Sequence, residues 1–392
     1  MMHRPNFENA ASAVSPTALA CEARWLDWPT ARDMIVERGA ALAERVSEPN
    51  ALLEPYALAA ALDAFGSDGI RLFTMWQGDR LVGLLPVHAD RRYGRWPFPH
   101  VRNWLHANAF LGTPLVASGH EHDFWRALLS ALDREPGRAL FFHIEALGLG
   151  GPVEAALIDV AREQARAIGL VHREERAYIG KLDDPTAYFE EAVRGKKRKE
   201  LRRQKRRLEE EGGLSFERLE GAEAQAILPQ WADEFLALEK AGWKGENGSA
   251  LACASNTERF FREALSGAAQ AGRLELVALR FDGRAIAMLV NLLAEPGAFS
   301  FKTAYDEGFA RYSPGVLLQE YNLGLVTRPG IDWCDSCAAE DHPMIDHLWR
   351  ERRAVGRYSV GIGGSLRRRL FGVLLAAETK RVAARREEKT ND

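Results

Sequence analysis

Cysteine is scarce in this chain, whose 392 residues include only four. So few cysteines in so long a chain form no disulfide framework, which fits a reducing compartment such as the cytoplasm. The sequence also has no run of about 18 apolar residues, the length that a membrane-spanning helix needs. Its first residues show no apolar core of a signal peptide. These absences argue against a disulfide-stapled secreted domain and a membrane-spanning protein, and we expect a cytoplasmic protein.

An excess of charge of one sign is also missing. The chain has 52 Lys and Arg against 55 Asp and Glu, which gives a net charge of −3. No global field attracts nucleic acid or a membrane, so any such partner would have to bind a local patch. A hydrophobic fraction of 46% and a charged fraction of 27% are typical of a globular protein. The length is too great for one ordinary core and predicts two or three domains.

The same succession of elements occurs twice along the chain. Residues 23–180 and 181–360 each predict helices, a β-hairpin, a strand region, a helix and a further strand. The turns Gly78-Asp79 and Asp282-Gly283 stand at matching places in the two hairpins. We therefore predict an α+β fold of two tandem units, each a mixed, mostly antiparallel sheet flanked by helices.

Three further segments complete the predicted organisation. Residues 1–22 are small, polar and rich in alanine, and we expect them to be poorly ordered. The pattern over 186–212 predicts a long basic helix that bridges the two units. Residues 361–392 form a tail with a basic amphipathic helix. This helix either docks on the fold or contacts an anionic membrane surface.

A strand, a short loop and a helix follow one another from Phe299 to Asn322. Ser313 suits the N-cap of this helix, and Pro314 suits its first position, where a missing N–H costs nothing. Gly315 lets another group approach the helix backbone closely. The unpaired N–H groups of a first turn and the positive end of the helix dipole together attract phosphate. We therefore predict an anion site at the start of this helix.

Alternation along the strand divides its side chains between two faces. Lys302 stands in the middle of this otherwise apolar strand, and burying it without a partner would be costly. It therefore needs a role in a site, or else a salt-bridge partner or an exposed strand face. One face is predicted to carry Phe299, Phe301, Thr303 and Tyr305, and the other Ser300, Lys302, Ala304 and Asp306.

Nine basic residues and one acidic residue lie between Lys196 and Leu208. A solvated helix explains this run. The alternative is an anionic pocket or substrate bound by some of the cations, with Lys196 and Arg198 as candidates. Nucleic-acid binding is the least favoured reading, because the chain has neither a reader motif nor a basic overall charge.

Two other local patterns concern the candidate site and metals. The segment 243–249 predicts a loop that borders a cleft, and a helix end with a packing Trp243 is the alternative. Cys334 and Cys337 are spaced like a metal or redox pair, but on a strand their sulfurs would point to opposite faces. His342 and His347 lack the helical spacing of a zinc site. We therefore expect structural histidines and no metal.

Several short stretches, taken in order, carry a resemblance to a known family. They are Glu239, Gly242–Gly245, Gly248-Ser249, Asp282-Gly283, Ala285, Ala287, Phe301–Asp306, Ser313–Leu318, Asp335 and Trp349. In this set the chain resembles the GNAT-type acyltransferases of the CelD-like branch, which occur with bacterial exopolysaccharide and cellulose synthesis. That branch is similar to the Fem-type peptidyltransferases in carrying two tandem GNAT folds. The similarity runs best over 180–358 and is weaker over 50–175.

The resemblance implies an acyl-CoA donor, acetyl-CoA foremost, with its pyrophosphate at the helix start. Fem-type relatives instead take aminoacyl-tRNA. The loop here has a single glycine, Gly315, and one spacer residue more than the usual GNAT loop, so both donors stay open. The first half has no Ser-Pro-Gly equivalent, and we expect it to shape the acceptor cleft. The donor-binding residues implied are Arg311, Tyr312, Ser313, Gly315 and Val316.

The expected chemistry is direct acyl transfer from a thioester to an amine or a hydroxyl. Glu239 and Asp306 are the candidate bases, and Lys302 is the candidate contact for the acceptor or a developing charge. The candidate substrate-binding residues are Trp243, Lys244, Tyr305, Lys196 and Arg198.

The acceptor would be a small molecule or a saccharide, in the cytoplasm or at the periphery of the inner membrane with an envelope-synthesis complex. Two alternatives stay open. One is an aminoacyl-tRNA-dependent transferase whose basic helix holds RNA, and the other is a non-catalytic scaffold of a polysaccharide-synthesis system.

Overall fold

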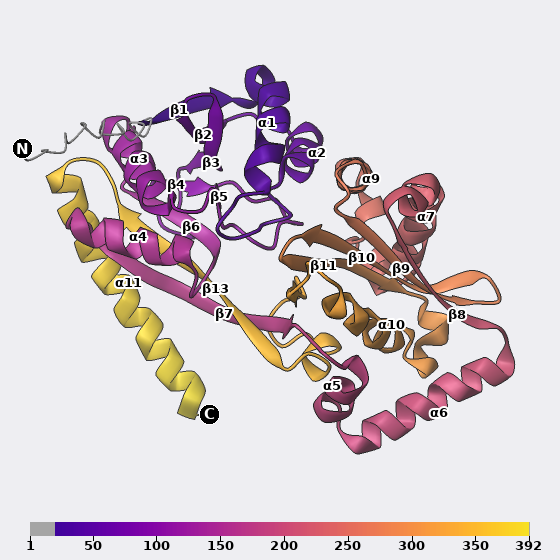
Figure 1. The fold of residues 1–392 in the computed structure, drawn as a ribbon. Coiled ribbons are helices and arrows are strands. Elements are labelled where there is room, and N and C mark those ends of the chain that lie inside the picture. The colour runs from indigo at the N-terminus through magenta and orange to yellow at the C-terminus, as the bar shows by residue number, and fades with distance from the viewer. Residues whose placement is uncertain (1–19, 392) are drawn as a thin grey trace, which may run out of the picture.

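Two α+β units share one continuous, twisted sheet (Figure 1). The computed structural model describes residues 20–391. Thirteen strands form the sheet in the order β1-β2-β3-β4-β6-β13-β7-β12-β11-β10-β9-β8, and β5 pairs with β3. The pairs β4–β6 and β11–β12 are parallel, and the other pairs are antiparallel. The predicted fold class, a mixed and mostly antiparallel sheet flanked by helices, is confirmed.

The first unit is built from the N-terminal part of the chain. Its strands are β1 (Cys21–Asp27), β2 (Ile70–Gln77), β3 (Arg80–Asp90), β4 (His100–Asn103), β5 (Leu115–Val116), β6 (Phe141–Gly148) and β7 (Ile168–Gly180). Its helices are α1 (Trp28–Ala43), α2 (Pro55–Phe65), α3 (Glu121–Arg134) and α4 (Pro152–Glu163).

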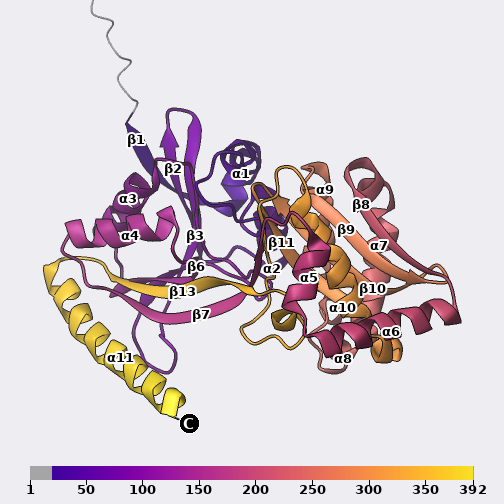
Figure 2. The same ribbon diagram turned by 60° about the horizontal axis from the view of Figure 1, so that its bottom comes forward.

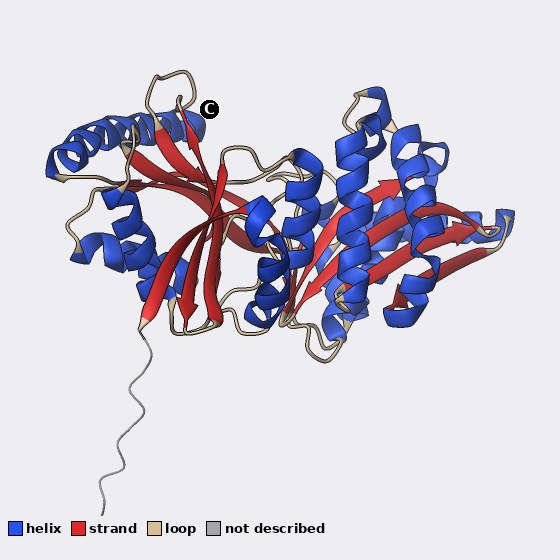
Figure 3. Ribbon diagram, turned by 90° about the horizontal axis from the view of Figure 1, so that it is seen from above, coloured by secondary structure: helices blue, strands red, loops and turns tan. Residues whose placement is uncertain are grey.

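The second unit follows β7, and helices lie on both faces of its strands (Figure 3). Its strands are β8 (Leu214–Glu220), β9 (Leu274–Phe281), β10 (Arg284–Ala294), β11 (Gly297–Tyr305) and β12 (Trp333–Asp335). Its α-helices are α5 (Pro185–Ala192), α6 (Gly195–Glu211), α7 (Gly221–Ala241), α8 (Trp243–Glu246), α9 (Ser255–Gln270) and α10 (Pro314–Asn322). The chain closes with β13 (Glu351–Gly361) and α11 (Ser365–Asn391).

The last strand, β13, returns to the first unit. It lies between β6 and β7 and is antiparallel to both. Its residues Tyr358 and Val360 belong to the core of the first unit. The predicted bounds of the second unit, 181–360, therefore differ from the structure, because β13 belongs to the sheet of the first unit. Figure 2 shows β7 and β13 side by side as the two long strands that reach toward the second unit.

The single basic helix predicted over 186–212 is two helices, α5 and α6. The chain turns between them because Val193 has an extended backbone, with φ −96° and ψ 128°. Arg198 holds this corner by donating to the carbonyl oxygens of Val193, at 2.7 Å, and of Glu190. A propensity pattern cannot show such a break, since the corner depends on contacts that form only after the chain turns.

Both predicted hairpins are present. β2 and β3 join at Gly78 and Asp79, and β9 and β10 join at Asp282 and Gly283. Gly78, Asp282 and Gly283 have positive φ angles of 62°, 46° and 82°. Such turns match the twist of the strands they connect, so these local signals were sufficient to predict the hairpins.

The predictions for the two ends of the chain fare differently. Of the segment 1–22 that was predicted to be poorly ordered, residues 1–19 lie outside the described residues. Cys21 and Glu22 belong to β1 and pair with β2, so the prediction is wrong for these two residues. At the other end, α11 docks on the first unit through Phe371 and Leu375. Within the described part of the chain, no helix combines the length and the apolar character needed to cross a membrane.

The two units also meet through helix packing. Helix α2 of the first unit lies against α9 of the second. Gly267 permits this approach, because a Cβ atom there would lie only 2.7 Å from the Cβ of Tyr56. The loop after β4 likewise reaches toward the second unit, where Phe110 packs near Phe301. The candidate site described next lies at this junction.

Candidate active site

A cavity of about 670 Å³ opens where β11 and β12 separate. The two strands pair only from Gly297 to Phe299 on β11, so the rest of β11 has no strand partner on that side. The lining comes from α6, α8, β11, the start of α10 and the segment 336–348, with Val193 after α5, Ala310 before α10 and one residue of the first unit, Phe110. Unpaired strand N–H groups in such a place can polarise a carbonyl group.

The alternation predicted along the strand is wrong after Phe301. The pairing of β10 with β11 shifts register there, since Val290 pairs with Lys302 and the next residue, Asn291, pairs with Ser300. Phe301 is therefore the extra residue of a β-bulge, which changes the face of every later side chain. Because of this shift, Thr303 and Tyr305 lie on the same face as Ser300, and all three line the cavity. Phe301 and Lys302, at the bulge itself, line it as well.

Lys302 is the central charged group of the cavity. Its Nζ donates to Asn108 Oδ1 at 2.8 Å, across the junction between the two units. The same Nζ lies 5.2 Å from the ring centroid of Phe110 and 5.5 Å from that of Phe301. Burial, helped by the neighbouring Lys244 cation, lowers the pKa of Lys302 to about 8. Lys302 is thus a half-buried, hydrogen-bonded amine that can change protonation near physiological pH.

The start of α10 forms another wall of the cavity. Ser313 holds the N-cap position in a left-handed conformation (φ 55°), but its side chain makes no capping hydrogen bond. Its carbonyl oxygen accepts from the N–H groups of Val316 and Leu317 at 3.0 and 3.1 Å. Pro314 has no N–H, so Gly315 carries the first N–H of the helix. Ser313, Pro314, Gly315 and Val316 all line the cavity, as does Lys197 of α6.

Neither predicted base lines the cavity. Glu239 is buried; its Oε1 pairs with Lys244 Nζ at 2.9 Å, and its Oε2 accepts from Leu251 N at 2.8 Å. The Oδ1 of Asp306 accepts from Gly308 N at 2.8 Å, and its Oδ2 pairs with Arg284. Both carboxylates are thus held by structural partners, and they position the loop after α7 and the turn after β11.

Four further predicted residues also lie away from the lining. Arg311 and Tyr312 face the end of α6, where both bond to Glu211. Arg198 holds the corner between α5 and α6, and Lys196 is exposed while the next residue, Lys197, faces the cavity. The predicted residues that the fold brings together are Trp243, Lys244, Lys302, Tyr305, Ser313, Gly315 and Val316.

Asp335 is a structural centre whose partners the sequence did not reveal. Its carboxylate is fully buried and pairs with Arg176 at 2.7 Å and Arg353 at 3.1 Å. Burial alone would raise the pKa of Asp335, but the two guanidinium groups lower it overall. Arg176 also donates to the carbonyl oxygen of Phe110 at 2.6 Å. Asp335 therefore fixes the first-unit loop that closes the cavity. In the sequence, the only signal for Asp335 was its presence among the residues that carry the family resemblance.

The cysteines and histidines after β12 contribute to the walls. Cys337, His342 and His347 line the cavity. Burial raises the pKa of the Cys334 and Cys337 thiols, which disfavours the thiolate form that metals and redox partners need. Burial lowers the pKa of His342, whose Nδ1 accepts from the N–H of Met344 at 3.4 Å.

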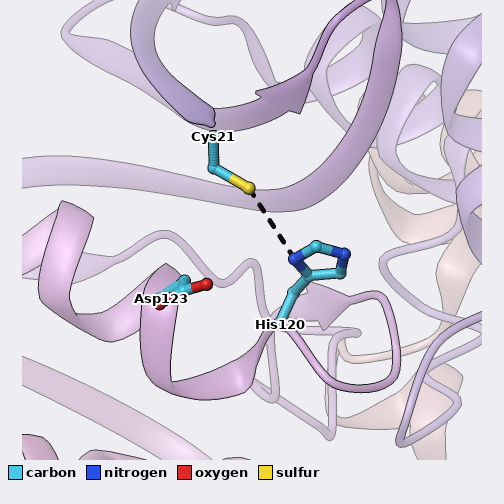
Figure 4. A group of neighbouring side chains, drawn as sticks. All are labelled: Cys21, His120 and Asp123. Atoms are coloured by element: carbon cyan, nitrogen blue, oxygen red, sulfur yellow. Dashed lines mark hydrogen bonds between the residues drawn. The ribbon is translucent and has the colours of Figure 1, made fainter. Parts of the chain in front are cut away.

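One group of possible metal ligands occurs among residues 20–391, and it lies in the first unit. Cys21 of β1, His120 and Asp123 have ligand atoms within 4.8 Å of one another (Figure 4). Cys21 Sγ lies 3.7 Å from His120 Nδ1, the distance of a hydrogen bond to sulfur. Burial raises the pKa of this thiol, and Asp123 is exposed. Nothing else at this place points to an ion.

A second cavity, of about 1150 Å³, lies in the first unit against α11. It shares no lining residue with the cavity at β11. Tyr93, His100, Arg102, His143 and Glu378 contribute to its lining. Its lining contains both Arg92, Arg95, Arg102 and Arg357 and the carboxylates of Asp90, Glu145 and Glu378.

Comparison with known proteins shows which domain family the region around the cavity resembles. Residues 195–342 match the model of the acetyltransferase (GNAT) domain. This range begins at α6 and ends before β13, the strand that joins the first unit. No curated protein matches the chain.

Three solved structures share the overall fold. FemX has 10% identity, a TM-score of 0.52 and coverage of 83% of this chain and 95% of FemX. A conserved protein of unknown function from Bacteroides thetaiotaomicron has 13% identity, a TM-score of 0.52 and coverage of 87% and 100%. A C-terminal domain assigned to a lysylphosphatidylglycerol synthetase from Agrobacterium fabrum has 13% identity, a TM-score of 0.51 and coverage of 88% and 96%. The chain thus contains, at 195–342, a region similar to the acetyltransferase (GNAT) domain, which supports an acyltransferase.

Proposed function

We propose that this protein transfers an acyl group from acyl-CoA, acetyl-CoA foremost, directly to an amine or hydroxyl of a small molecule or saccharide. The observation that carries the proposal is the meeting of three features in one cavity: the start of α10, the edge of β11 that β12 leaves unpaired and the half-buried Lys302. Each feature suits a different part of a thioester donor with a phosphate tail. The similarity of 195–342 to the acetyltransferase (GNAT) domain supports the same reading.

The residues present fit such a donor. The first N–H of α10, at Gly315, and the cation of Lys197 face the cavity and would hold the pyrophosphate. An N–H group of β11 beyond Phe299 that points away from β10 would hold the thioester carbonyl, because β12 no longer pairs with the strand there. When bound, the donor supplies an activated acyl group that needs no covalent enzyme intermediate.

Lys302 is then the group that stabilises developing charge. With a pKa of about 8, its Nζ is mostly protonated at neutral pH and can donate a hydrogen bond to an oxyanion. Glu239 and Asp306 are held by other partners, so we assign neither of them the role of base. His347, exposed in the segment that borders the cavity, is the candidate to accept the proton of the acceptor.

A second candidate is an aminoacyl-tRNA-dependent transferase. The shared fold with FemX and the basic face of α6 beside the cavity favour it. Against it, Arg203, Lys205 and Arg206 pair with acidic residues of α6 itself, which weakens the field available to RNA. For either donor, we propose the setting that the resemblance to the CelD-like branch implies, namely exopolysaccharide or cell-envelope synthesis.

Calorimetric titration with acetyl-CoA tests the first candidate. We expect a dissociation constant between about 1 μM and 1 mM, the usual range of enzyme substrates. Parallel titrations use CoA and aminoacyl-tRNA at several salt concentrations. If acetyl-CoA gives no binding while aminoacyl-tRNA binds with a steep salt dependence, the second candidate replaces the first. Binding of neither donor would indicate a scaffold without catalysis.

A further inference from the structure

Helix α11 presents apolar side chains to solvent along one face. Leu366 is 81% exposed, Leu370 is 52% exposed and Val373 is 70% exposed. They recur at spacings of four and three residues, so they form one stripe of a helix. The opposite face carries Phe371 and Leu375, which are buried against Phe141 and Val171 of the first unit. The fold therefore accounts for the inner face of α11 and leaves this outer stripe, Leu366–Leu370–Val373, without a partner in the described chain.

Such a stripe is unusual for this molecule. Of the large hydrophobic residues that are exposed in the described chain, half belong to α11, and the others are scattered on α1, α8 and the loop after β3. Scattered apolar side chains need no explanation, whereas a row of them marks an interaction surface. At the left edge of the molecule in Figure 1, α11 lies beside β7 and β13 and no other element covers its outer side.

Arginines lie close to the stripe in the part of α11 whose side chains the structure describes. From Ser365 to Thr379 the sequence has three arginines and one acidic residue, while the whole chain has a net charge of −3. Arg369 is exposed next to Leu370. Arg367 donates to the carbonyl oxygens of Gly137 and Ala139, which brings the start of α11 beside the turn after α3. The exposed Arg134 and Arg138 flank that turn.

We propose that the outer face of α11 binds the surface of an anionic lipid bilayer. Three apolar side chains can enter the boundary between headgroups and acyl chains, and the surrounding arginines can pair with lipid phosphates. An RNA backbone would match the arginines but not the apolar stripe. A second copy of the chain would match the stripe but would bring two basic helices together. The lipid surface satisfies both features, and it would hold the enzyme at a membrane without a spanning segment.

Sedimentation of the full-length protein with vesicles tests the proposal. The probes are vesicles of phosphatidylcholine alone and of phosphatidylcholine with about 30% phosphatidylglycerol, which gives the surface a negative potential. We expect binding to the anionic vesicles only, with weakening as salt rises. The triple variant Leu366→Gln, Leu370→Gln, Val373→Gln should bind at least about tenfold more weakly. It should keep the thermal unfolding of the wild type, since all three side chains are exposed.

Two further variants make the test specific. Arg369→Glu should also weaken binding to the anionic vesicles. Met34→Gln, at an exposed apolar residue of α1, should bind like the wild type. Equal binding by the triple variant and the wild type would overturn the proposal, as would no binding to either vesicle at low salt. If the wild type binds no vesicles but forms dimers by light scattering that the triple variant does not form, the stripe binds a second copy of the chain instead. If the wild type binds RNA and not vesicles, and the triple variant loses RNA binding, the partner is RNA.

Discussion

At the scale of single residues, Lys302 and Asp335 show how the cavity is held together from both units. Lys302 reaches Asn108 of the first unit, and Asp335 binds Arg176 of the strand that the two units share. The first arrangement places a charge where it is costly, and the second compensates a buried charge with two partners. The two residues should therefore affect stability in opposite directions.

Replacing Lys302 by Met should stabilise the protein at pH 7 by about 1–3 kcal/mol. The pKa of Lys302 falls from its ordinary 10.5 to about 8 in the fold, so below pH 8 the cation is present in both states and its burial costs the most. The difference from wild type should shrink as pH rises from 8 to 10.5, where the unfolded chain also loses the proton. Urea unfolding at pH 7 and pH 10 measures this.

The same variant should lose most activity, by about 100-fold or more if Lys302 stabilises developing charge. A variant that is less stable than the wild type at pH 7, or a stability difference that is independent of pH, would contradict this account of Lys302.

Replacing Asp335 by Asn should destabilise the protein by about 3–5 kcal/mol, because two largely buried guanidinium groups lose their counter-charge. The lowered pKa of Asp335 adds a pH dependence. Its contribution is present above the pKa of the unfolded carboxyl and is lost as pH falls through the lower value of the folded state. Asp332→Asn is the matched control, since Asp332 is exposed and lies 3.9 Å from Lys181. Denaturant unfolding of both variants should give no more than about 0.5 kcal/mol for the control.

At the scale of elements, the start of α10 joins a helix end to the cavity. At Gly315, the effect of an added negative charge can be distinguished from the effect of added side-chain volume. A Cβ atom there would meet Met344 Sδ at 3.0 Å and Tyr305 Cδ1 at 3.4 Å, and the thioether is the flexible end of a side chain. Alanine should therefore be accommodated with a small movement of Met344.

Gly315→Glu should weaken acetyl-CoA binding at least about tenfold, because it places a carboxylate where the donor phosphates would bind. The helix should stay folded, since an acidic group at a helix N-terminus is favourable. Gly315→Ala should stay within about threefold of the wild type in the same calorimetric titration. Equal losses for both variants would show that space, and not charge, decides at this position.

At the scale of the whole molecule, the chain cannot be cut into two independent halves. β13 supplies the strand between β6 and β7, although 170 residues separate Glu351 from Gly180 in the sequence. The return of β13 to the first unit also creates the buried ion pairs of the junction. Arg176 lies on β7 and Arg353 on the neighbouring β13, and both pair with Asp335 on β12.

Truncation at two points tests whether the first unit needs β13. A chain ending at Gly364 lacks only α11 and should unfold cooperatively with a modest loss of stability, because Phe371 and Leu375 are its main buried contacts. A chain ending at Arg350 also lacks β13 and should show no cooperative unfolding of the first unit, since β6 and β7 lose the strand between them. Circular dichroism during thermal unfolding distinguishes the two. A folded chain that ends at Arg350 would contradict this reading of the architecture.

The sequence by itself determined what depends on neighbouring residues. The two hairpins follow from the turns at Gly78-Asp79 and Asp282-Gly283, and the start of α10 follows from Ser313-Pro314-Gly315. The α+β class follows from the order of these patterns. All are local, because backbone preference and side-chain periodicity act over a few residues.

Only the tertiary structure decided which side chains meet. The bulge at Phe301 is a matter of register with β10, and it turned Thr303 and Tyr305 toward the cavity. The selection of Lys197 over Lys196 depends on how α6 rotates when it docks. Asn108 and Phe110 reach Lys302 from a loop nearly 200 positions earlier in the chain. Contacts between distant segments are set by packing and burial of the whole fold, which no local pattern of residues encodes.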